Sequence, residues 1–376
     1  MFARTLPHFS LPLVMPFPDF APSVGQFHPG CPKRARYSNP SGRRPGENVV
    51  KLRLEPIVSS PEDHRSPSER ARTAAHNLSV DLVTAEVVTA LEAAGVKSIL
   101  LKGPSVARWL YDGPGLRAYA DCDLLVAPGE FPRAQGVLRD LGFAPEPDRV
   151  GLEELAIGQE WKRAGAIVDL HRRLTAFDDD PDRVWTSLSN KSEPLPVGGR
   201  NVEVLREDVR ALHLALHALH HAIEGTKARH DLSLAVARLP SSLWLEAATL
   251  AGELGLHEAL GAGLRMVEGG EAVARRAGLP DAESIAVVLR TEASSRFDLE
   301  YALALGRLAG LAPTQRLRAL GRRLVPPKAY MRSWAAHIGG GKMGLVRAYF
   351  YRPLWIAAHG LSTMALIRRS RRRARR

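Results

Sequence analysis

The apolar positions of this chain follow different patterns along its length. Residues 1 to about 70 show no hydrophobic period and are rich in Pro, Ser, Gly and Arg, which predicts a disordered leader. From 71 to 206, short apolar runs alternate with helical patterns. From 207 to 335, long Ala- and Leu-rich stretches predict helices, and 336–376 combines an amphipathic segment with an arginine-rich tail. The predicted class is α+β: a small mixed β-sheet with flanking helices, followed by an α-helical domain.

Separate short elements are predicted in the middle stretch. Gly95 and Gly142 each follow a helical pattern, as helix ends do, and Pro104 suits the first position of a helix. The predicted elements are a helix from about Ser68 to Ala94, a strand at Val96–Leu101, a helix at Ser105–Tyr111, a strand at Asp121–Val126, a helix at Glu130–Leu141, paired strands at Glu160–Arg163 and Ala166–His171, and an edge strand at Asn201–Leu205. The helical half is predicted to contain Asp208–Ile223, Leu232–Leu239, Leu243–Leu254 and Asp298–Gly310.

Most of the basic charge lies at one end of the chain. The formal net charge is +12, but Arg368–Arg376 contains seven arginines and no acid, and without it +5 remains. The charge therefore does not indicate a nucleic-acid-binding fold. The tail and the preceding apolar stretch, Gly344–Ile367, fit weak contact with an anionic membrane surface, or contact with RNA or DNA without sequence choice; a plain solvated tail is the alternative.

Cysteine usage and hydropathy bear on the compartment. Cys31 and Cys122 are the two cysteines, too few for a disulfide framework or a CxxC zinc site, so a reducing, cytoplasmic setting fits best. No run of 18 or more apolar residues lacks charge, so no membrane-spanning helix is expected. The expected location is cytoplasmic, and the tail leaves open a peripheral position at the inner face of the membrane.

Two aspartates begin the second predicted strand. Asp121 and Asp123 project from one face of that strand, and Cys122 points the opposite way. Adjacent carboxylates repel each other unless a cation lies between them, and Mg²⁺ (or Mn²⁺) binds carboxylates together with phosphate oxygens. Asp169, on a later apolar strand, is the best candidate for a third ligand or a general base. The alternative is an acidic pair that only caps or solvates a turn.

Upstream of the acids, a strand ends at Lys102 and Gly103 and a helix follows. Such a turn lets backbone N–H groups approach a triphosphate, and Lys102 could share its charge, although a solvated lysine at a strand end is the alternative. Arg117 is a candidate phosphate clamp, because a guanidinium group matches two phosphate oxygens; alternatively it neutralises the acids.

Residues 96–126 resemble the uncharacterised nucleotidyltransferase family of the polymerase-beta-like superfamily. The resemblance rests on Leu-Lys-Gly at 101–103, Arg117, and Asp-Cys-Asp-Leu-Leu-Val at 121–126, and weaker pieces follow in the same order as far as about residue 355. It implies a polymerase-beta-like nucleotidyltransferase fold for 71–206, with Asp121, Asp123 and Asp169 as metal ligands and Gly103 in the phosphate-binding turn. The superfamily usually has Gly-Ser at this turn. Here Pro104 follows the glycine and Ser105 is displaced by one position.

Histidines are the remaining candidates. His171 lies two residues after Asp169 and should share its face, where it could orient a metal ligand or contact substrate; a structural histidine is the alternative. The stripe His213, His217, His220 and His221 lies at helical spacing without a His-Glu-x-x-His pattern, and this favours packing at an interface over metal binding.

These observations predict a Mg-dependent nucleotidyltransferase that moves a nucleoside monophosphate from an NTP to an acceptor. Asp121, Asp123 and Asp169 would serve catalysis and metal binding, and Lys102, Gly103, Ser105 and Arg117 would bind the nucleotide. The acceptor, whether a small molecule, a peptide or protein, or RNA, would sit between the α/β unit and the helical domain. The alternative is a catalytically degenerate binding protein that docks on membrane or nucleic acid through its basic tail.

Overall fold

The computed structural model describes residues 66–374, except 147–156, 178–179, 224, 282–283, 294–295, 311, 325, 327, 329 and 333–340. The predicted disordered leader therefore lies outside the described residues as far as residue 65. Its last residues belong to the first helix, which is fixed at its start by a capping box. Ser66 Oγ accepts a hydrogen bond from the Glu69 N–H, and the Ser66 N–H donates to Glu69 Oε2 at 2.7 Å.

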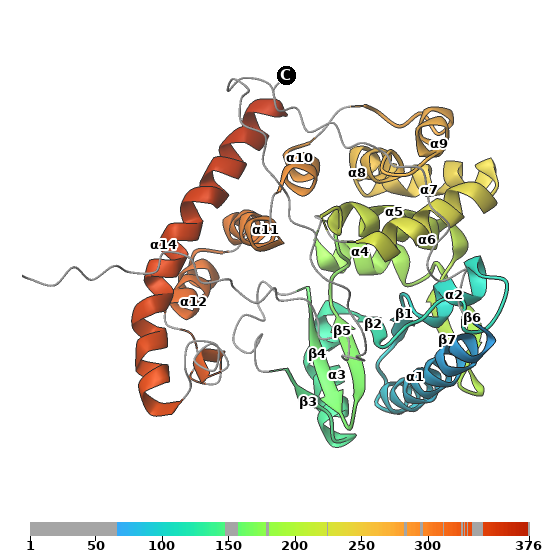
Figure 1. The fold of residues 1–376 in the computed structure, drawn as a ribbon, viewed down its shortest axis with the longest axis horizontal. Coiled ribbons are helices and arrows are strands. Elements are labelled where there is room, and N and C mark those ends of the chain that lie inside the picture. The colour runs from blue at the N-terminus through green and yellow to red at the C-terminus, as the bar shows by residue number, and fades with distance from the viewer. Residues whose placement is uncertain are drawn as a thin grey trace, which may run out of the picture. The chain divides into compact units, whose positions relative to one another are not determined.

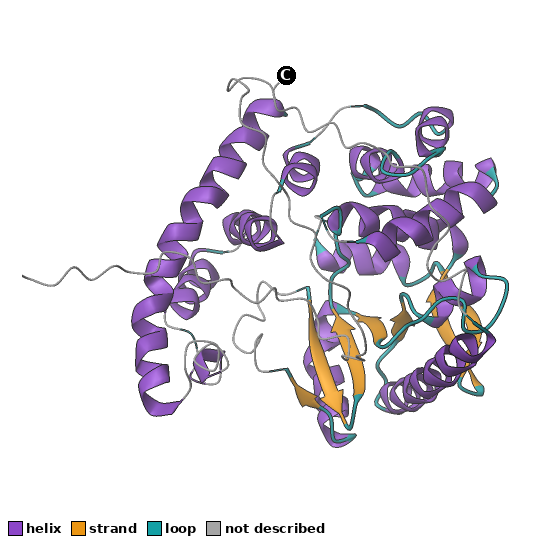
Figure 2. Ribbon diagram, viewed as in Figure 1, coloured by secondary structure: helices purple, strands orange, loops and turns teal. Residues whose placement is uncertain are grey.

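Helices and a single sheet make up the described chain (Figures 1 and 2). The sheet strands are β1 Ser98–Leu100, β2 Cys122–Val126, β3 Ala144–Pro145, β4 Gly158–Arg163, β5 Ala166–His171, β6 Ser192–Val197 and β7 Arg200–Leu205. The helices are α1 Pro67–Ala93, α2 Pro104–Leu110, the 3-10 turn η1 Pro128–Glu130, α3 Phe131–Asp140, α4 Pro181–Leu188, α5 Glu207–His220, α6 Thr226–Arg238, α7 Ser241–Glu253, α8 His257–Leu264, α9 Gly270–Arg276, α10 Ile285–Glu292, α11 Arg296–Gly310, α12 Pro313–Leu324 and α14 Gly341–Arg373. The α+β class predicted from the pattern is confirmed.

The sheet has seven strands in the order β3-β4-β5-β2-β1-β7-β6 and contains both parallel and antiparallel pairs. β2 lies between β1, to which it is antiparallel, and β5, to which it is parallel. The hairpin β4–β5 turns at Ala164 and Gly165, which both have positive φ angles (45° and 86°), as a two-residue hairpin turn of this kind requires. This topology places the two strands that carry the predicted acids next to each other.

Each face of the sheet has its own hydrophobic core. On one face, Leu100, Leu124 and Val168 pack against α1 and α3. On the other face, Ile99, Leu101 and Leu125 pack into a larger core with α2, α4 and the helices from α5 to α8. Alternation along β2 explains the division: Cys122 and Leu124 face the first core, and Asp123 and Leu125 face the side of α5. The predicted division at residue 206 stays a prediction, since one core includes side chains from both sides of it.

Two strands are missing from the prediction and several predicted element bounds are wrong. Prolines explain the missed strands. The pattern does not predict β6, which contains Pro194 and Pro196, or β3, which contains Pro145. Both strands form edges of the sheet, where a residue without an N–H is tolerated. The predicted strands at 96–101 and 121–126 are longer than β1 and β2, and the helix predicted at 232–239 starts six residues earlier, as α6. The strand predicted at 201–205 is not an edge strand, because β7 lies between β1 and β6.

The C-terminal part of the described chain contains one long helix. α14 packs against α10 and α11, with Leu366 buried among Leu289, Leu299 and Leu303. Its inner face is also tied by hydrogen bonds, since Thr363 Oγ1 donates to Asp298 Oδ1 at 3.0 Å. None of the described helices combines the length and the apolar character needed to cross a membrane.

Candidate active site

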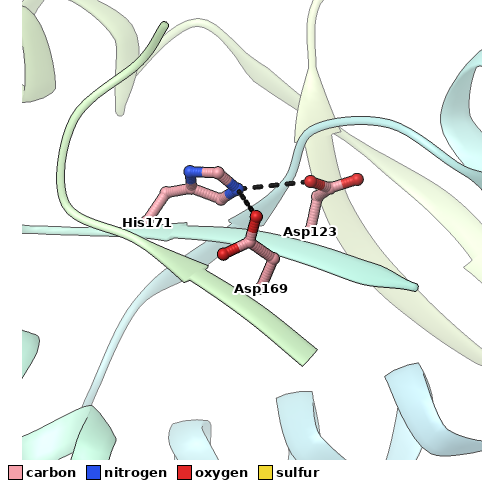
Figure 3. Close-up of side chains that lie close together, drawn as sticks. All are labelled: Asp123, Asp169 and His171. Carbon is pink, nitrogen blue, oxygen red and sulfur yellow. Dashed lines mark hydrogen bonds and ion pairs between the residues drawn. The ribbon is translucent and has the colours of Figure 1, made fainter. Parts of the chain in front are cut away.

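Parallel pairing of β2 with β5 brings two predicted acids into direct register. Asp123 is the partner of Asp169, and His171 follows two residues later on the same face of β5. Asp123 and His171 are buried, whereas Asp169 is partly exposed. His171 Nε2 lies 3.2 Å from Asp123 Oδ1 and 3.2 Å from Asp169 Oδ2 (Figure 3). The three side chains offer ligand atoms within 4.8 Å of one another, which makes them a candidate metal site.

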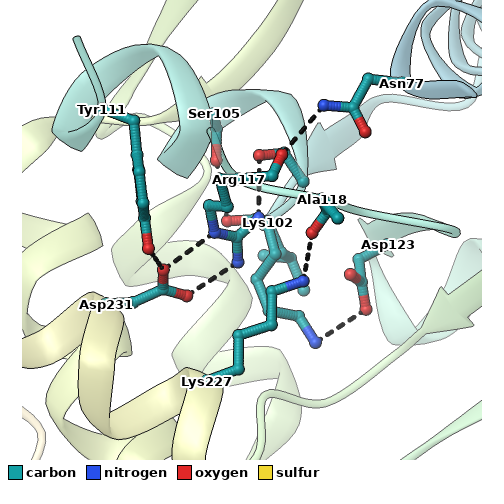
Figure 4. A network of polar contacts seen from close by, with 11 residues as sticks. Asn77, Lys102, Ser105, Tyr111, Arg117, Ala118, Asp123, Lys227 and Asp231 are labelled. Carbon is teal, nitrogen blue, oxygen red and sulfur yellow. Dashed lines mark hydrogen bonds and ion pairs between the residues drawn. The ribbon is translucent and has the colours of Figure 1, made fainter. Parts of the chain in front are cut away.

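A lysine already lies beside these carboxylates. Lys102 Nζ is 2.9 Å from Asp123 Oδ1 (Figure 4). Burial by itself would raise the pKa of Asp123, but the charges of Lys102 and His171 outweigh it and hold that pKa below its ordinary value. Burial opposes the charge on His171, yet Asp169 and Asp123 raise its pKa to about 9. The cluster is therefore a set of buried and partly buried charges that compensate one another.

Asp121 lies outside this triad of ligand atoms. It directly precedes β2, and the nearby charge of Asp123 together with burial raises its pKa to about 6, while Lys102 and Lys227 act in the opposite direction. Of the three predicted metal ligands, the structure brings Asp123 and Asp169 together and adds His171, with Asp121 close enough to interact electrostatically. The role of each as a ligand stays a prediction.

Gly103 forms the turn between β1 and α2. Its φ and ψ angles of 61° and −115° are accessible essentially only to glycine, which explains the residue type at this turn. Ser105 is fully buried, and its Oγ donates to the Leu101 carbonyl at 3.0 Å. The hydroxyl of Ser105 thus faces the core of the turn, and its predicted part in nucleotide binding is untested.

Arg117 has a carboxylate partner in the helical half. Its Nε and Nη2 donate to the two oxygens of Asp231 on α6, at 2.9 and 2.8 Å, and both residues are buried. Nη1 donates to the Gly103 carbonyl at 3.2 Å. Arg117 therefore connects the glycine turn to α6 (Figure 4). It neutralises Asp231, and its predicted contact with phosphate stays a prediction.

Polar residues on α1 position the segment that leads to Asp121, a function that the sequence patterns do not predict. Asn77 Nδ2 donates to the Arg117 carbonyl at 2.9 Å, and Asn77 Oδ1 accepts from the Tyr119 N–H. Asp81 accepts hydrogen bonds from the Tyr119 hydroxyl at 2.9 Å and from Arg108 at 2.7 Å. The sequence offered one signal for this function: Asn77 and Asp81 are polar residues within the apolar stripe of the predicted helix. These residues also line a groove of about 460 Å³ between α1, α2 and residues 113–119.

The histidine stripe of α5 lies near the triad. Ring centroids of His213 and His217 are 6.0 Å apart, and those of His217 and His221 are 4.4 Å apart. Burial lowers the pKa of His213 to about 3, and the positive charge of Lys102 contributes. Burial also lowers the pKa of His217, so these two rings favour the neutral form. Packing of the whole stripe at an interface stays a prediction. Over the described residues, the only group with metal-ligand spacing is Asp123, Asp169 and His171.

Paired strand carboxylates beside a glycine turn, on a mixed sheet, are the arrangement expected from the nucleotidyltransferase resemblance. The profile of a family described as uncharacterised nucleotidyltransferase matches residues 46–269, so the chain belongs to that family and is a transferase by family. No curated protein matches the chain.

Two solved structures are similar over about half of the chain. One is the solution structure of the antibiotic-resistance factor ANT(2'')-Ia, with 14% identity, a TM-score of 0.35, and coverage of 48% of this chain and 95% of the other. The second is the crystal structure of an antigenic nucleotidyltransferase-like protein from Paracoccidioides brasiliensis, with 13% identity, a TM-score of 0.30, and coverage of 51% and 93%. Similarity this low carries no argument about substrate.

Proposed function

We propose that this protein transfers a nucleoside monophosphate from an NTP to an acceptor, with a divalent cation bound by Asp123 and Asp169. The observation that carries the proposal is the register of β2 and β5, which holds two carboxylates and His171 within reach of one ion. Lys102 on the neighbouring turn supplies a positive charge for the triphosphate. In the reaction, an acceptor oxygen bonds to the α-phosphorus, the bond from that phosphorus to the bridging oxygen breaks, and pyrophosphate leaves.

The donor set fits a divalent cation. Asp169 Oδ1 is buried and has no hydrogen-bond partner among the described residues, so this oxygen can bind a cation. Carboxylate oxygens suit Mg²⁺. The imidazole of His171 is compatible with Mn²⁺ once it releases its proton to solvent, which binding of the ion would favour. Such an ion would offset charge on the triphosphate as the leaving group departs.

The chain's own groups have separate tasks in this proposal. Asp169, which is partly exposed, or Asp121 would take the proton of the acceptor hydroxyl, which requires a carboxylate near the attacking oxygen. Lys102 would exchange Asp123 for a phosphate oxygen when the ion and the nucleotide bind. Gly103 would allow the triphosphate to approach the backbone, and Arg117 would hold that turn in place through its bond to the Gly103 carbonyl.

Binding of Mn²⁺ and nucleotides tests the proposal. The loss of the free Mn²⁺ EPR signal should report at least one site per chain, and one or more of the four NTPs should raise the melting temperature when Mg²⁺ is present. Asp123→Asn and Asp169→Asn should each remove both effects. Asp140→Asn, at an exposed acid at the end of α3, is the matched control and should leave both unchanged.

Turnover is tested with α-³²P-labelled NTPs and a cell extract, in which a labelled acceptor should appear only with the unsubstituted protein and the Asp140→Asn control. Binding of Mn²⁺ and NTP without any labelled product would favour the degenerate binding protein. Absence of NTP-dependent stabilisation with all four nucleotides and both metals would overturn the proposal.

A further inference from the structure

The outward face of α14 carries a continuous apolar line. Val346, Phe350, Leu354, Leu361 and Met364 follow one another at intervals of four, four, seven and three residues, which keeps them on one side of a helix. Phe350 and Leu361 are each 76% exposed and Leu354 is 69% exposed. Side chains of this size rarely stay exposed in a row on a soluble surface. We call these five residues the apolar line; from Val346 to Met364 it extends about 27 Å.

The opposite face of α14 packs against α10 and α11. Thr363 and Leu366 are buried against α11 and α10, and Ser362 and Thr363 both donate hydrogen bonds to Asp298. The helix is therefore anchored to the helical half by one side. Its apolar line points away from that contact and needs a different covering surface.

The charge of α14 identifies what covers the line. From residue 341 to 376 the sequence contains ten lysines and arginines and no aspartate or glutamate. Arg368 and Arg372 lie four and eight residues after Met364, so they continue the apolar line on the same side, and both are exposed. One surface of the helix thus offers apolar side chains followed by cations, without any acid to compensate them.

An anionic lipid surface satisfies both features. Its acyl region accepts the apolar side chains and its headgroups attract the arginines. A second copy of this helix would bring eight more positive charges and no acid, so pairing along the apolar line is opposed by repulsion in either direction. RNA or DNA would match the arginines but leave Phe350, Leu354 and Leu361 in water.

We propose that α14 lies along an anionic phospholipid bilayer surface, with the apolar line inserted between the headgroups and Arg368 and Arg372 bound to lipid phosphate. The inference goes beyond nucleotidyl transfer and does not depend on it. It places the protein, whatever its acceptor, on a membrane face rich in anionic lipid.

Vesicle binding by the full chain tests the proposal. The protein should co-sediment with vesicles of phosphatidylcholine and phosphatidylglycerol, and binding should weaken as salt rises and with phosphatidylcholine alone. Arg368→Gln with Arg372→Gln should lower the partition coefficient about 30-fold, since each cation near such a surface contributes about fivefold. Phe350→Ser with Leu354→Ser and Leu361→Ser should lower it at least tenfold.

Matched controls separate this binding from general stickiness. Leu82→Ser with Leu245→Ser removes two exposed leucines from α1 and α7, and Arg275→Gln with Arg276→Gln removes two exposed arginines from α9. Both should bind vesicles as the unsubstituted protein does, and circular dichroism melts should show that all variants fold. Unchanged vesicle binding by the serine variant would overturn the proposal. So would a dimer that this variant abolishes, or binding to an oligonucleotide in place of vesicles.

Discussion

At the scale of single residues, the pairing of Arg117 with Asp231 has a measurable consequence. Both side chains are buried, at 5% and 3% exposure, so removing one partner leaves an uncompensated charge. We expect Asp231→Asn to lower the free energy of unfolding by about 3 kcal/mol or more, as broken buried pairs do. Urea denaturation measures this.

The control for this pair is the exposed pair of Arg275 with Glu271 on α9. Arg275→Gln should leave the midpoint of urea denaturation nearly unchanged, because both side chains of this pair are mostly exposed. If Asp231→Asn behaves like Arg275→Gln, the buried pair of Arg117 with Asp231 is not formed in solution.

His213 predicts a pH dependence of stability. Its pKa is about 3 in the folded protein, below the ordinary value of 6.5, because burial and the charge of Lys102 disfavour protonation. Between these values the unfolded chain binds a proton that the folded chain does not, so stability falls as pH falls below 6.5. The slope approaches about 1.4 kcal/mol per pH unit.

Comparison of unfolding free energies at pH 7 and pH 5 for the protein and for His213→Leu isolates this contribution. The charged groups around His213, namely Lys102, Asp123 and His171, are present in both proteins. His76→Leu, at an exposed position of α1, should keep the full slope. Equal slopes for the protein and His213→Leu would contradict a buried neutral ring.

The residues of the site were partly predictable from sequence. A two-residue spacing places Asp123 with Asp121 and Asp169 with His171 on single strand faces, and β2–β5 pairing completes the cluster. No local pattern gives the partner of Arg117, because Asp231 is 114 residues away. For the same reason, the contacts of Asn77 with residues 117 and 119 could not be foreseen from either segment alone.

At the scale of elements, the close contact between β4 and β5 fixes the strand that carries Asp169 and His171. A Cβ on Gly158 would come within 2.5 Å of the Leu170 carbonyl and 3.1 Å of the His171 ring. We expect Gly158→Ala to displace β4 from β5, with a loss of about 1–3 kcal/mol of stability and weaker Mn²⁺ binding. Thermal unfolding and EPR titration test both effects.

Gly136, in contrast to Gly158, has room for a side chain. It lies inside α3, and a Cβ there would meet nothing within 4 Å. Gly136→Ala should therefore raise stability by about 0.5–1 kcal/mol, through its effect on chain entropy and helix propensity. If both alanine variants stabilise the protein, the close β4–β5 contact is not present as described.

Among the elements, those with strong periodicity were predicted and those governed by tertiary context were not. The pattern gives α1, α2, β2, α3 and the β4–β5 hairpin within a few residues. It misses β6, because two prolines oppose a strand assignment that only an edge position permits. It also misses α8, α9 and α10, which are short helices of seven or eight residues.

At the scale of the whole molecule, the shared core joins the sheet to the helical half. Ile99, Leu101 and Leu125 lie in one cluster with side chains of α5 to α8. A fragment of residues 66–206 would expose that sheet face. We expect it to bind the dye ANS and to unfold without a sharp transition, whereas 66–292, which keeps the cluster complete, should unfold cooperatively.

Circular dichroism melts and ANS fluorescence of the two fragments test whether residues 66–206 fold without the helices that follow. Cooperative unfolding of 66–206 without dye binding would support the boundary predicted at residue 206. Failure of both fragments would instead show that α11 and α14 are needed for folding.

The side chain between Asp121 and Asp123 can report on the opening of β2. Cys122 is fully buried in the core behind the site, and burial raises the pKa of its thiol to about 12. A thiol reagent can therefore react only when β2 separates from α1 and α3. In a Cys31→Ser background, the labelling rate should measure how often the backbone that carries Asp121 and Asp123 opens. A bound ligand should slow the labelling, because it stabilises the closed strand.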